Sequence, residues 1–183
     1  MLESKRIYLR RFEEKDAAQL LKWGTNKRYH DMAGFEQYQN MDDALSGVHQ
    51  YMARPESYVI CLRGNNEVIG LIELYERGMD EKSGLLKTKE VGFLLDQNFE
   101  GHGYMTEALH LILNYAFKKK RQLEVWAGTF SNNEKSQKLL EKMGFHYVYT
   151  VDYVQISQIF SYKEKYYLLR KEEWLKIDAN TKS

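Results

Sequence analysis

Apolar residues recur along this chain with two periods, and the change of period marks the expected strands and helices. Alternation of apolar and polar residues predicts a half-buried strand, whereas spacings of three and four predict an amphipathic helix. Strands are expected at Lys5–Phe12, Ser57–Leu62, Glu67–Tyr75, Glu90–Leu95, Glu124–Thr129, Phe145–Gln155 and Tyr162–Leu169. Helices are expected at Glu14–Trp23 and Asp42–Met52, from Gly103 to Phe117, and from Ser131 to Met143. Strands and helices are therefore mixed along the chain.

The links between these elements set the expected topology. Arg63-Gly64-Asn65-Asn66 has the residues of a tight hairpin turn, so the two flanking strands are expected to be antiparallel. One helix lies between strands Glu90–Leu95 and Glu124–Thr129, and such a crossover predicts a parallel pair. The expected fold class is α/β (α+β), with a mixed, mostly antiparallel central sheet and helices on both faces.

Three local signals mark helix ends. Ser131-Asn132-Asn133-Glu134 has the S-x-x-E form of a capping box and is expected to start a helix. Gly144 follows that helix and is expected to be its left-handed C-cap. Lys118-Lys119-Lys120-Arg121 is interpreted as a helix C-terminus, where partial negative charge favours cations, rather than as a nucleic-acid contact.

Composition narrows the class of protein without naming a reaction. The chain has 183 residues, 43% hydrophobic and 14% aromatic, which excludes a disordered polymer. We expect a single domain over residues 1–177 and a polar C-terminal tail over residues 178–183. A net charge of +1 does not favour nucleic acid or a membrane surface as partner. No apolar run approaches the length of a membrane span, so we expect a soluble, cytoplasmic protein.

The cysteine and histidine positions argue against a metal site. The one cysteine, Cys61, lies between Ile60 and Leu62 and is expected to be a buried thiol. His102 and His110 are eight residues apart, and no CxxC or HxxxH spacing occurs. We therefore expect no metal.

The stretch NFEGHGYMTEAL, residues 98–109, places two glycines around His102 just before a helix. A helix N-terminus offers free N–H groups and partial positive charge, and glycines let the backbone approach a ligand closely. Such a site suits a phosphate or pyrophosphate, but a loop with an ordinary helix entry explains the same residues. Thr106 stands where a dinucleotide fingerprint needs its third glycine, and no P-loop run occurs.

Several motifs, taken in order, indicate a family. They are Ile7-Tyr8-Leu9-Arg10-Arg11-Phe12, the Gly-Tyr-x-Thr-Glu-Ala run at 103–108, Asn133 with Ser136, Glu141-Lys142-Met143-Gly144-Phe145 and Tyr166-Tyr167-Leu168-Leu169-Arg170. Their order and spacing resemble the GNAT superfamily of acyl-CoA N-acyltransferases. In detail the chain looks like the ribosomal-protein N-terminal acetyltransferases of the Rim type.

The resemblance implies a GNAT-type fold in one domain, residues 1–177, with acetyl-CoA as cosubstrate. The backbone amides of Gly101, His102, Gly103, Tyr104, Met105 and Thr106 would hold the coenzyme A pyrophosphate. The strand containing Phe93, Leu94 and Leu95 would pair with the pantetheine arm, and Asn133 and Ser136 would contact the cofactor. Asn98 stands where the family usually has Gln or Arg, which matters little if the amides do the binding.

Transfer of an acetyl group to an amine requires a neutral amine and a protonated leaving thiolate. Glu90 begins the strand expected to line the cofactor and is the first candidate for the base. Glu73, an isolated carboxylate on an apolar strand face, is the second. The tyrosine that protonates the thiolate in many members would fall at Leu140, and Ser136 is the replacement that the Rim branch suggests.

The acceptor is left open between a protein N-terminus, a polyamine and another small amine. Trp23, Tyr29, His30, Phe35 and Tyr38, with residues 78–88 and the C-terminal tyrosines, either line its pocket or pack under a loop. Acidic residues in the same region, Glu36, Asp42, Asp43 and Asp80, would suit a cationic amine. A homodimer is possible in this family. The alternative function is a non-catalytic acyl-CoA-binding or regulatory module, which the missing tyrosine keeps open.

Overall fold

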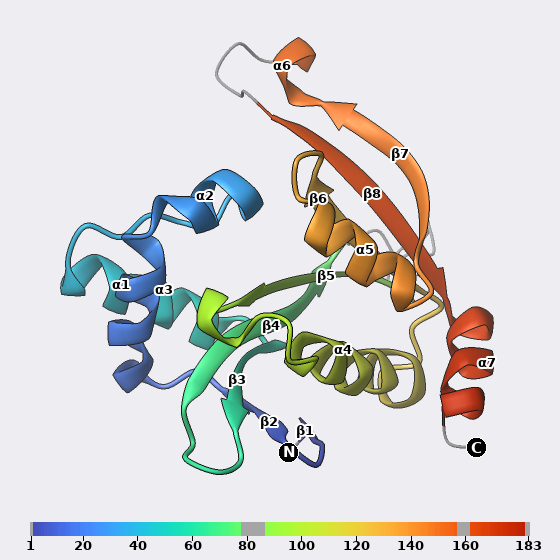
Figure 1. Cartoon of the computed structure of the whole chain (residues 1–183), viewed down its shortest axis with the longest axis horizontal. Helices are drawn as coiled ribbons and strands as arrows, with labels where there is room; N and C mark the ends of the chain where they lie inside the picture. Colours follow the sequence, from blue (N-terminus) through green and yellow to red (C-terminus); the bar gives the residue numbers. More distant parts are fainter. Residues whose placement is uncertain (1, 78–86, 157–161, 182–183) are drawn as a thin grey trace. The chain divides into compact units, whose positions relative to one another are not determined.

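The computed structural model describes residues 2–77, 87–156 and 162–181 (Figure 1). The chain divides into two compact units, which are described separately. Unit 1 comprises Met1–Glu73 and Phe93–Ile112, and unit 2 comprises Leu74–Gly92 and Leu113–Ser183. Residues 78–86, most of the expected 78–88 loop, lie outside the described residues, as does the acidic candidate Asp80.

The strands form a mixed sheet. They are β1 (Leu2–Glu3), β2 (Ile7–Arg11), β3 (Ser57–Leu62), β4 (Val68–Glu76), β5 (Thr88–Leu95), β6 (Glu124–Phe130), β7 (His146–Asp152) and β8 (Lys163–Arg170). Hydrogen-bonded neighbours follow the order β1-β2-β3-β4-β5-β6-β8-β7, and β4 and β5 contribute residues to both units. The pair β5–β6 is parallel, whereas β1–β2, β2–β3, β3–β4, β6–β8 and β7–β8 are antiparallel. The expected fold class is confirmed, including the hairpin and the parallel crossover.

The helices agree with the sequence pattern in part. The described helical segments are η1 (Glu14–Asp16), α1 (Ala17–Gly24), α2 (Lys27–Ala33), α3 (Met41–Ala53), η4 (Gln97–Phe99), α4 (Tyr104–Asn114), η5 (Tyr115–Lys119), α5 (Glu134–Lys142), α6 (Tyr153–Ile156) and α7 (Lys171–Thr181). The short helix α2 was not expected. The strand expected to reach Gln155 ends at Asp152 and gives way to α6.

An aromatic cluster forms the core of unit 1 on the side of α1 and α3. Trp23, Phe35 and Tyr38 are buried there, and Phe35 packs edge-on against the other two rings. His30 is exposed, and its Nδ1 contacts the Phe35 carbonyl at 3.1 Å. Of the two readings of these aromatic residues, packing under a loop is the one observed, because Trp23, Phe35 and Tyr38 are too buried to line an open pocket. Burial also raises the pKa of the Cys61 thiol, as expected for a structural cysteine.

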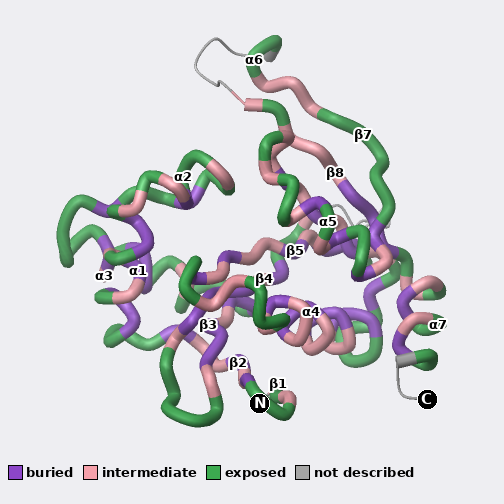
Figure 2. Tube along the Cα trace, viewed as in Figure 1, coloured by how far each residue is buried: buried purple, intermediate pink, exposed green. Residues whose placement is uncertain are grey.

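Unit 2 contains α5 and the β6–β8–β7 ribbon, and Figure 2 shows β7 exposed over most of its length. The expected capping box at Ser131 is wrong: the N-cap of α5 is Asn133, whose side chain accepts a hydrogen bond from the Ser136 backbone N–H. Asn133, two residues after Ser131, caps the helix instead, because its side-chain oxygen accepts a hydrogen bond from a backbone N–H of the first turn. Gly144 has the expected left-handed conformation, with φ 91°.

The C-terminal residues pack within unit 2 as helix α7. Residues 178–181 continue this helix, although we expected a polar tail from residue 178. Asp178 is buried and accepts hydrogen bonds from Asn114 at 3.2 Å and from Lys118 at 2.6 Å. Lys118, from the basic run, is thus an ion-pair partner at a helix end, which agrees with the electrostatic interpretation of that run. In the described parts of the chain, no helix has the length and apolarity needed to cross a membrane.

Candidate active site

The glycine loop between η4 and α4 exposes a series of unbonded backbone amides in unit 1. Gly101 and Gly103 have φ angles of 79° and 81°, a conformation that side chains with a Cβ rarely adopt. Among the described residues, none accepts a hydrogen bond from the backbone N–H groups of Gly101 to Thr106. Successive amides of this kind next to a helix N-terminus form a concave anion site. The loop therefore presents free amides next to a helix N-terminus, which both a phosphate site and an ordinary helix entry would show.

A buried carboxylate fixes the start of this loop. Asp96 Oδ1 caps η4 by accepting from the Asn98 N–H at 3.0 Å. Its Oδ2 accepts from Lys22 Nζ at 2.9 Å, Trp23 Nε1 at 3.1 Å and Gln19 Nε2 at 3.2 Å. Burial alone would raise the pKa of Asp96, but the hydrogen bonds from Asn98, Lys22 and Trp23 outweigh it and the pKa is lowered. Helix α1 thus determines where the loop begins.

The side chains of the loop brace it rather than point to a ligand. The exposed His102 donates from Nδ1 to the Glu100 carbonyl at 2.9 Å, and its ring stacks on Tyr104. The Arg6 guanidinium lies 4.7 Å from the centre of the Tyr104 ring and forms an ion pair with Glu107 in the first turn of α4. Hydrogen bonds within the loop and contacts with Arg6, the residue before β2, therefore hold the loop in place.

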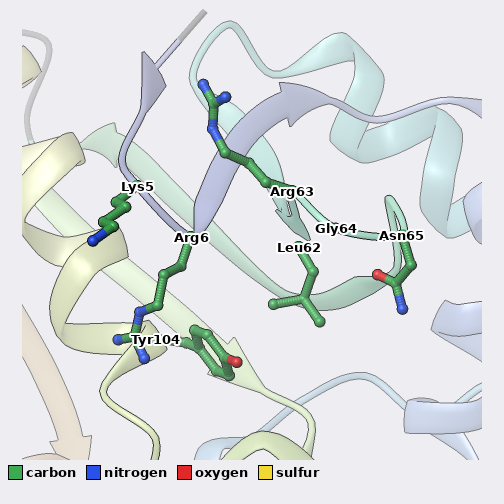
Figure 3. A pocket seen from close by; sticks show the side chains of 7 residues that line it. All are labelled: Lys5, Arg6, Leu62, Arg63, Gly64, Asn65 and Tyr104. Carbon is green, nitrogen blue, oxygen red and sulfur yellow. The ribbon is translucent and has the colours of Figure 1, made fainter.

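A shallow basic hollow adjoins the first residue of α4 (Figure 3). It measures about 610 Å³ and is lined by Lys5, Arg6, Leu62, Arg63, Gly64, Asn65 and Tyr104. In Figure 3 the Arg6 side chain extends to Tyr104, while Arg63 and Asn65 come from the β3–β4 hairpin. Glu3 pairs with Arg63, and none of the described residues forms an ion pair with Lys5. The hollow adds positive charge beside the loop.

The three β5 residues expected along the pantetheine arm differ in exposure. Leu94 is buried in the unit 1 core, so its side chain is not available to a ligand. Phe93 and Leu95 are half-buried. A Cβ added at Gly70 would lie 2.4 Å from the Leu94 carbonyl oxygen, which shows how closely β4 and β5 approach in unit 1.

Glu90, the first candidate base, belongs to a polar and aromatic cluster in unit 2. Its carboxylate accepts from Arg77 Nη1 at 2.9 Å and from the Tyr75 hydroxyl at 3.1 Å. The Arg77 guanidinium lies 4.1 Å from the Trp126 ring centre and 5.0 Å from that of Tyr166. The described β5–β6 pairing ends at Glu90 and Trp126, so the cluster begins where the two strands cease to pair.

Glu164, which the sequence analysis did not select, is a second carboxylate in this cluster. It accepts from the Tyr166 hydroxyl at 2.9 Å, and the Tyr153 and Tyr166 hydroxyls are 3.1 Å apart. Burial raises the pKa of Glu164; the negative charge of Glu90 acts in the same direction, and the tyrosine hydrogen bonds and Arg77 partly oppose it. Carboxyl groups with shifted pKa values are common at functional sites, and structural networks also contain them.

Glu73, the second candidate base, lies in unit 1 and is not isolated. Both its oxygens accept from Arg54 Nη1, at 3.0 and 3.2 Å, and one also accepts from the Ser57 hydroxyl at 2.7 Å. The alternation of apolar residues suggested a lone carboxylate because neither partner is near it in sequence.

Asn133 and Ser136 meet at the N-terminus of α5 in unit 2. The Asn133 side chain caps the helix through the Ser136 N–H, at 3.2 Å. The half-buried Ser136 hydroxyl has no described hydrogen-bond partner. Leu140, where a tyrosine acid would fall, is fully buried. In the described residues, no group of His, Cys, Asp and Glu is arranged to hold a metal ion.

Comparison with known proteins identifies the family. The acetyltransferase (GNAT) domain matches residues 6–146. A relative from Bacillus subtilis (strain 168), named Probable N-acetyltransferase YjcK, is 30% identical over 155 residues, which cover 80% of this chain and 83% of that one. A GNAT-family acetyltransferase structure from Bacillus anthracis has a TM-score of 0.81 at 21% identity, covering 94% of this chain and 99% of the other. A spermidine N-acetyltransferase from Vibrio cholerae, in complex with CoA and spermine, has a TM-score of 0.75 at 16% identity, with coverage of 94% and 99%.

The mixed sheet and these relatives define an acetyltransferase. The chain belongs to the GNAT family, whose members use acetyl-CoA, and it is an N-acetyltransferase.

Proposed function

We propose that this protein transfers the acetyl group of acetyl-CoA directly to a primary amine. The observation that carries the proposal is the run of unbonded amides from Gly101 to Thr106, which suits the coenzyme A pyrophosphate. Lys5, which lines the neighbouring hollow and has no ion pair among the described residues, supplies further positive charge for a phosphate-bearing ligand. The acyl donor contributes an activated thioester, and the protein has to position it and manage the protons.

The proposal assigns the proton transfers to unit 2. Glu90, oriented by Arg77 and Tyr75, takes the proton of the attacking amine directly or through water. Ser136 donates a proton to the leaving thiolate and regains one from water; among the described residues its hydroxyl has no hydrogen-bond partner. Asn133 sets the start of α5 and thereby the position of Ser136. Glu73 is the weaker candidate base, because Arg54 and Ser57 already bind its oxygens.

The acceptor in this proposal is a peptide N-terminus or a small amine. Two similarities favour testing both: the chain resembles the Rim branch in its motifs, and a structural neighbour was solved with spermine. We place the reaction in the cytoplasm, which cell fractionation would test. We also propose that the protein is a homodimer, which a measurement of its molecular mass in solution would test.

Replacement of a loop glycine tests the donor site. Gly103→Ala forces a Cβ onto a backbone with φ 81°, 3.3 Å from the Arg6 guanidinium, and is expected to weaken coenzyme A binding at least about tenfold. Ser46→Ala is the control, because Ser46 is exposed on α3 in the same unit and belongs neither to the loop nor to the lining of the hollow. Titration calorimetry with coenzyme A measures both variants.

Catalysis is tested separately by thiol release from acetyl-CoA with a panel of amines and N-terminal peptides. Release that depends on the amine supports the transferase. Tight coenzyme A binding without release against any acceptor would instead favour the non-catalytic acyl-CoA-binding or regulatory module. Equal coenzyme A affinity of the Gly103→Ala and wild-type proteins would remove the loop as the pyrophosphate site.

A further inference from the structure

The cluster around Arg77 in unit 2 has more negative than positive groups. Two carboxylates, Glu90 and Glu164, face one described guanidinium, that of Arg77. The Arg77 ion pair is made with Glu90, at 2.9 Å. When both carboxylates are ionised, the described residues therefore leave one negative charge without its own cation.

Glu164 is the carboxylate that lacks a cation. Its described hydrogen-bond partners are the hydroxyls of Tyr166 and Tyr153, and no lysine, arginine or histidine in the described residues lies within ion-pair distance. Hydroxyl donors orient a carboxylate but do not neutralise it. Since the side chain is half-buried, its charge is partly removed from water yet still open to a ligand.

Space for the carboxylate is made by the neighbouring strand. A Cβ at Gly128 would lie 2.4 Å from Glu164 Oε1, so β6 leaves out a side chain where the carboxylate lies. Phe130 on β6 and Val151 on β7 are the register partners of Glu164, and neither carries charge. The groups that influence its ionisation are therefore Tyr166, Tyr153, Glu90 and Arg77.

The same cluster already accommodates a cation on aromatic faces. The Arg77 guanidinium contacts the Trp126 and Tyr166 rings at 4.1 and 5.0 Å and donates to the Tyr149 hydroxyl. Aromatic faces beside carboxylates attract alkylammonium ions for the same electrostatic reason. Arg77 already covers the Trp126 and Tyr166 rings, so what the cluster offers a second cation is the Glu164 carboxylate beside them.

We propose that Glu164 selects the acceptor of the reaction: its carboxylate binds the ammonium group of an alkylamine, and Tyr153 and Tyr166 hold that carboxylate in place. The inference rests on the proposed acetyl transfer, because an alkylamine arrives mainly protonated at neutral pH. Neutral acceptors gain nothing from Glu164, and anionic ones are repelled. The acceptor class is therefore a cationic amine.

The experiment measures amine binding without acetyl-CoA. Wild-type protein is titrated calorimetrically with 1,4-diaminobutane and, as a neutral control, with 1-butanol. Glu164→Gln keeps the shape of the side chain and removes its charge, and it is expected to weaken diamine binding about tenfold or more. Glu134→Gln is the matched control, since Glu134 is an exposed glutamate of the same unit. In turnover, Glu164→Gln should raise the KM for the diamine while kcat and the coenzyme A affinity stay close to wild type.

A second variant and a pH titration complete the experiment. Where Glu164→Gln fails to fold, Tyr166→Phe, which removes one donor to the carboxylate, is titrated instead and is expected to bind the diamine more weakly. Wild-type affinity for the diamine should also fall as the pH is lowered and Glu164 takes up a proton. The inference is overturned if Glu164→Gln binds the diamine as tightly as wild type does; where that variant does not fold, Tyr166→Phe decides in the same way. Equal binding of diamine and butanol to the wild type also overturns it. Diamine binding through Glu164 without any acetyl transfer would support the inference while refuting the proposed function.

Discussion

Replacing Asp96 by asparagine tests how the glycine loop is held. The new amide can still accept from the Asn98 N–H, but its NH₂ group faces the donors of Trp23 and Lys22. The Trp23 indole is fully buried, so its unsatisfied N–H costs about 1–3 kcal/mol. Lys22 is 57% exposed and returns to water, so its ion pair is worth about 1 kcal/mol or less. The free energy of unfolding should therefore fall by about 1–4 kcal/mol.

Alanine at the same position removes the cap as well. Asp96→Ala leaves the Asn98 N–H without its acceptor, which adds about 1 kcal/mol to the loss. Urea unfolding followed by far-UV circular dichroism measures both variants. Asp31→Asn is the control, because its ion pair with Lys27 is an exposed i,i+4 contact worth about 0.5 kcal/mol or less.

The difference in unfolding free energy between wild type and Asp96→Asn should depend on pH. Since the folded pKa of Asp96 lies below its unfolded value, its contribution is present above about pH 4 and disappears as the pH falls through the folded pKa. The gap between wild type and Asp96→Asn should therefore be full at pH 6 and shrink in acid. An Asp96→Asn protein within about 0.5 kcal/mol of wild type at pH 6 would refute this account of the loop.

Three further variants separate chemistry from structure. Glu90→Gln should lower kcat at least about tenfold with little change in coenzyme A affinity, as expected for a general base; an unchanged pH–rate profile would remove Glu90 from that role. Glu73→Gln should leave kcat within about twofold but lower the melting temperature, because it loses charged bonds from Arg54; a large fall in kcat would make Glu73 the base instead. Gly70→Ala forces a Cβ 2.4 Å from the Leu94 carbonyl and should cost about 1–3 kcal/mol in urea unfolding; wild-type stability would contradict the close β4–β5 approach.

The fold was largely predictable because its signals are local. The hairpin at Arg63–Asn66 and the left-handed Gly144 follow from residues adjacent in sequence. The loop glycines, too, were placed at a helix start by periodicity alone, and their positive φ angles explain why no larger residue stands there. Helix α2 escaped prediction because its seven residues are too few to show a helical period, although Asn26 caps its start and Gly34 its end.

The site was less predictable because its partners are distant in sequence. Asp96 is joined to Trp23 across a separation of 73 residues, and no spacing rule reports such a contact. Glu73 looked isolated for the same reason, since Arg54 lies on another segment. Glu164 stands between Lys163 and Lys165, where a charged residue on a strand is ordinarily interpreted as solvated. Glu90 was proposed from the sequence because a family resemblance marked its strand position; its role as a base stays a prediction.

Glu90 and Glu164 show why the residue type alone could not assign roles in unit 2. Both are half-buried glutamates on strands, but their surroundings differ. Arg77 supplies a cation to Glu90, whereas Gly128 supplies only space to Glu164. A carboxylate already paired with a guanidinium gains little from a second cation, while one bound only to hydroxyls gains a counter-ion on binding an ammonium group. The two glutamates are therefore suited to different tasks: Glu164 to hold the charged amine and Glu90 to serve the proton transfer that follows.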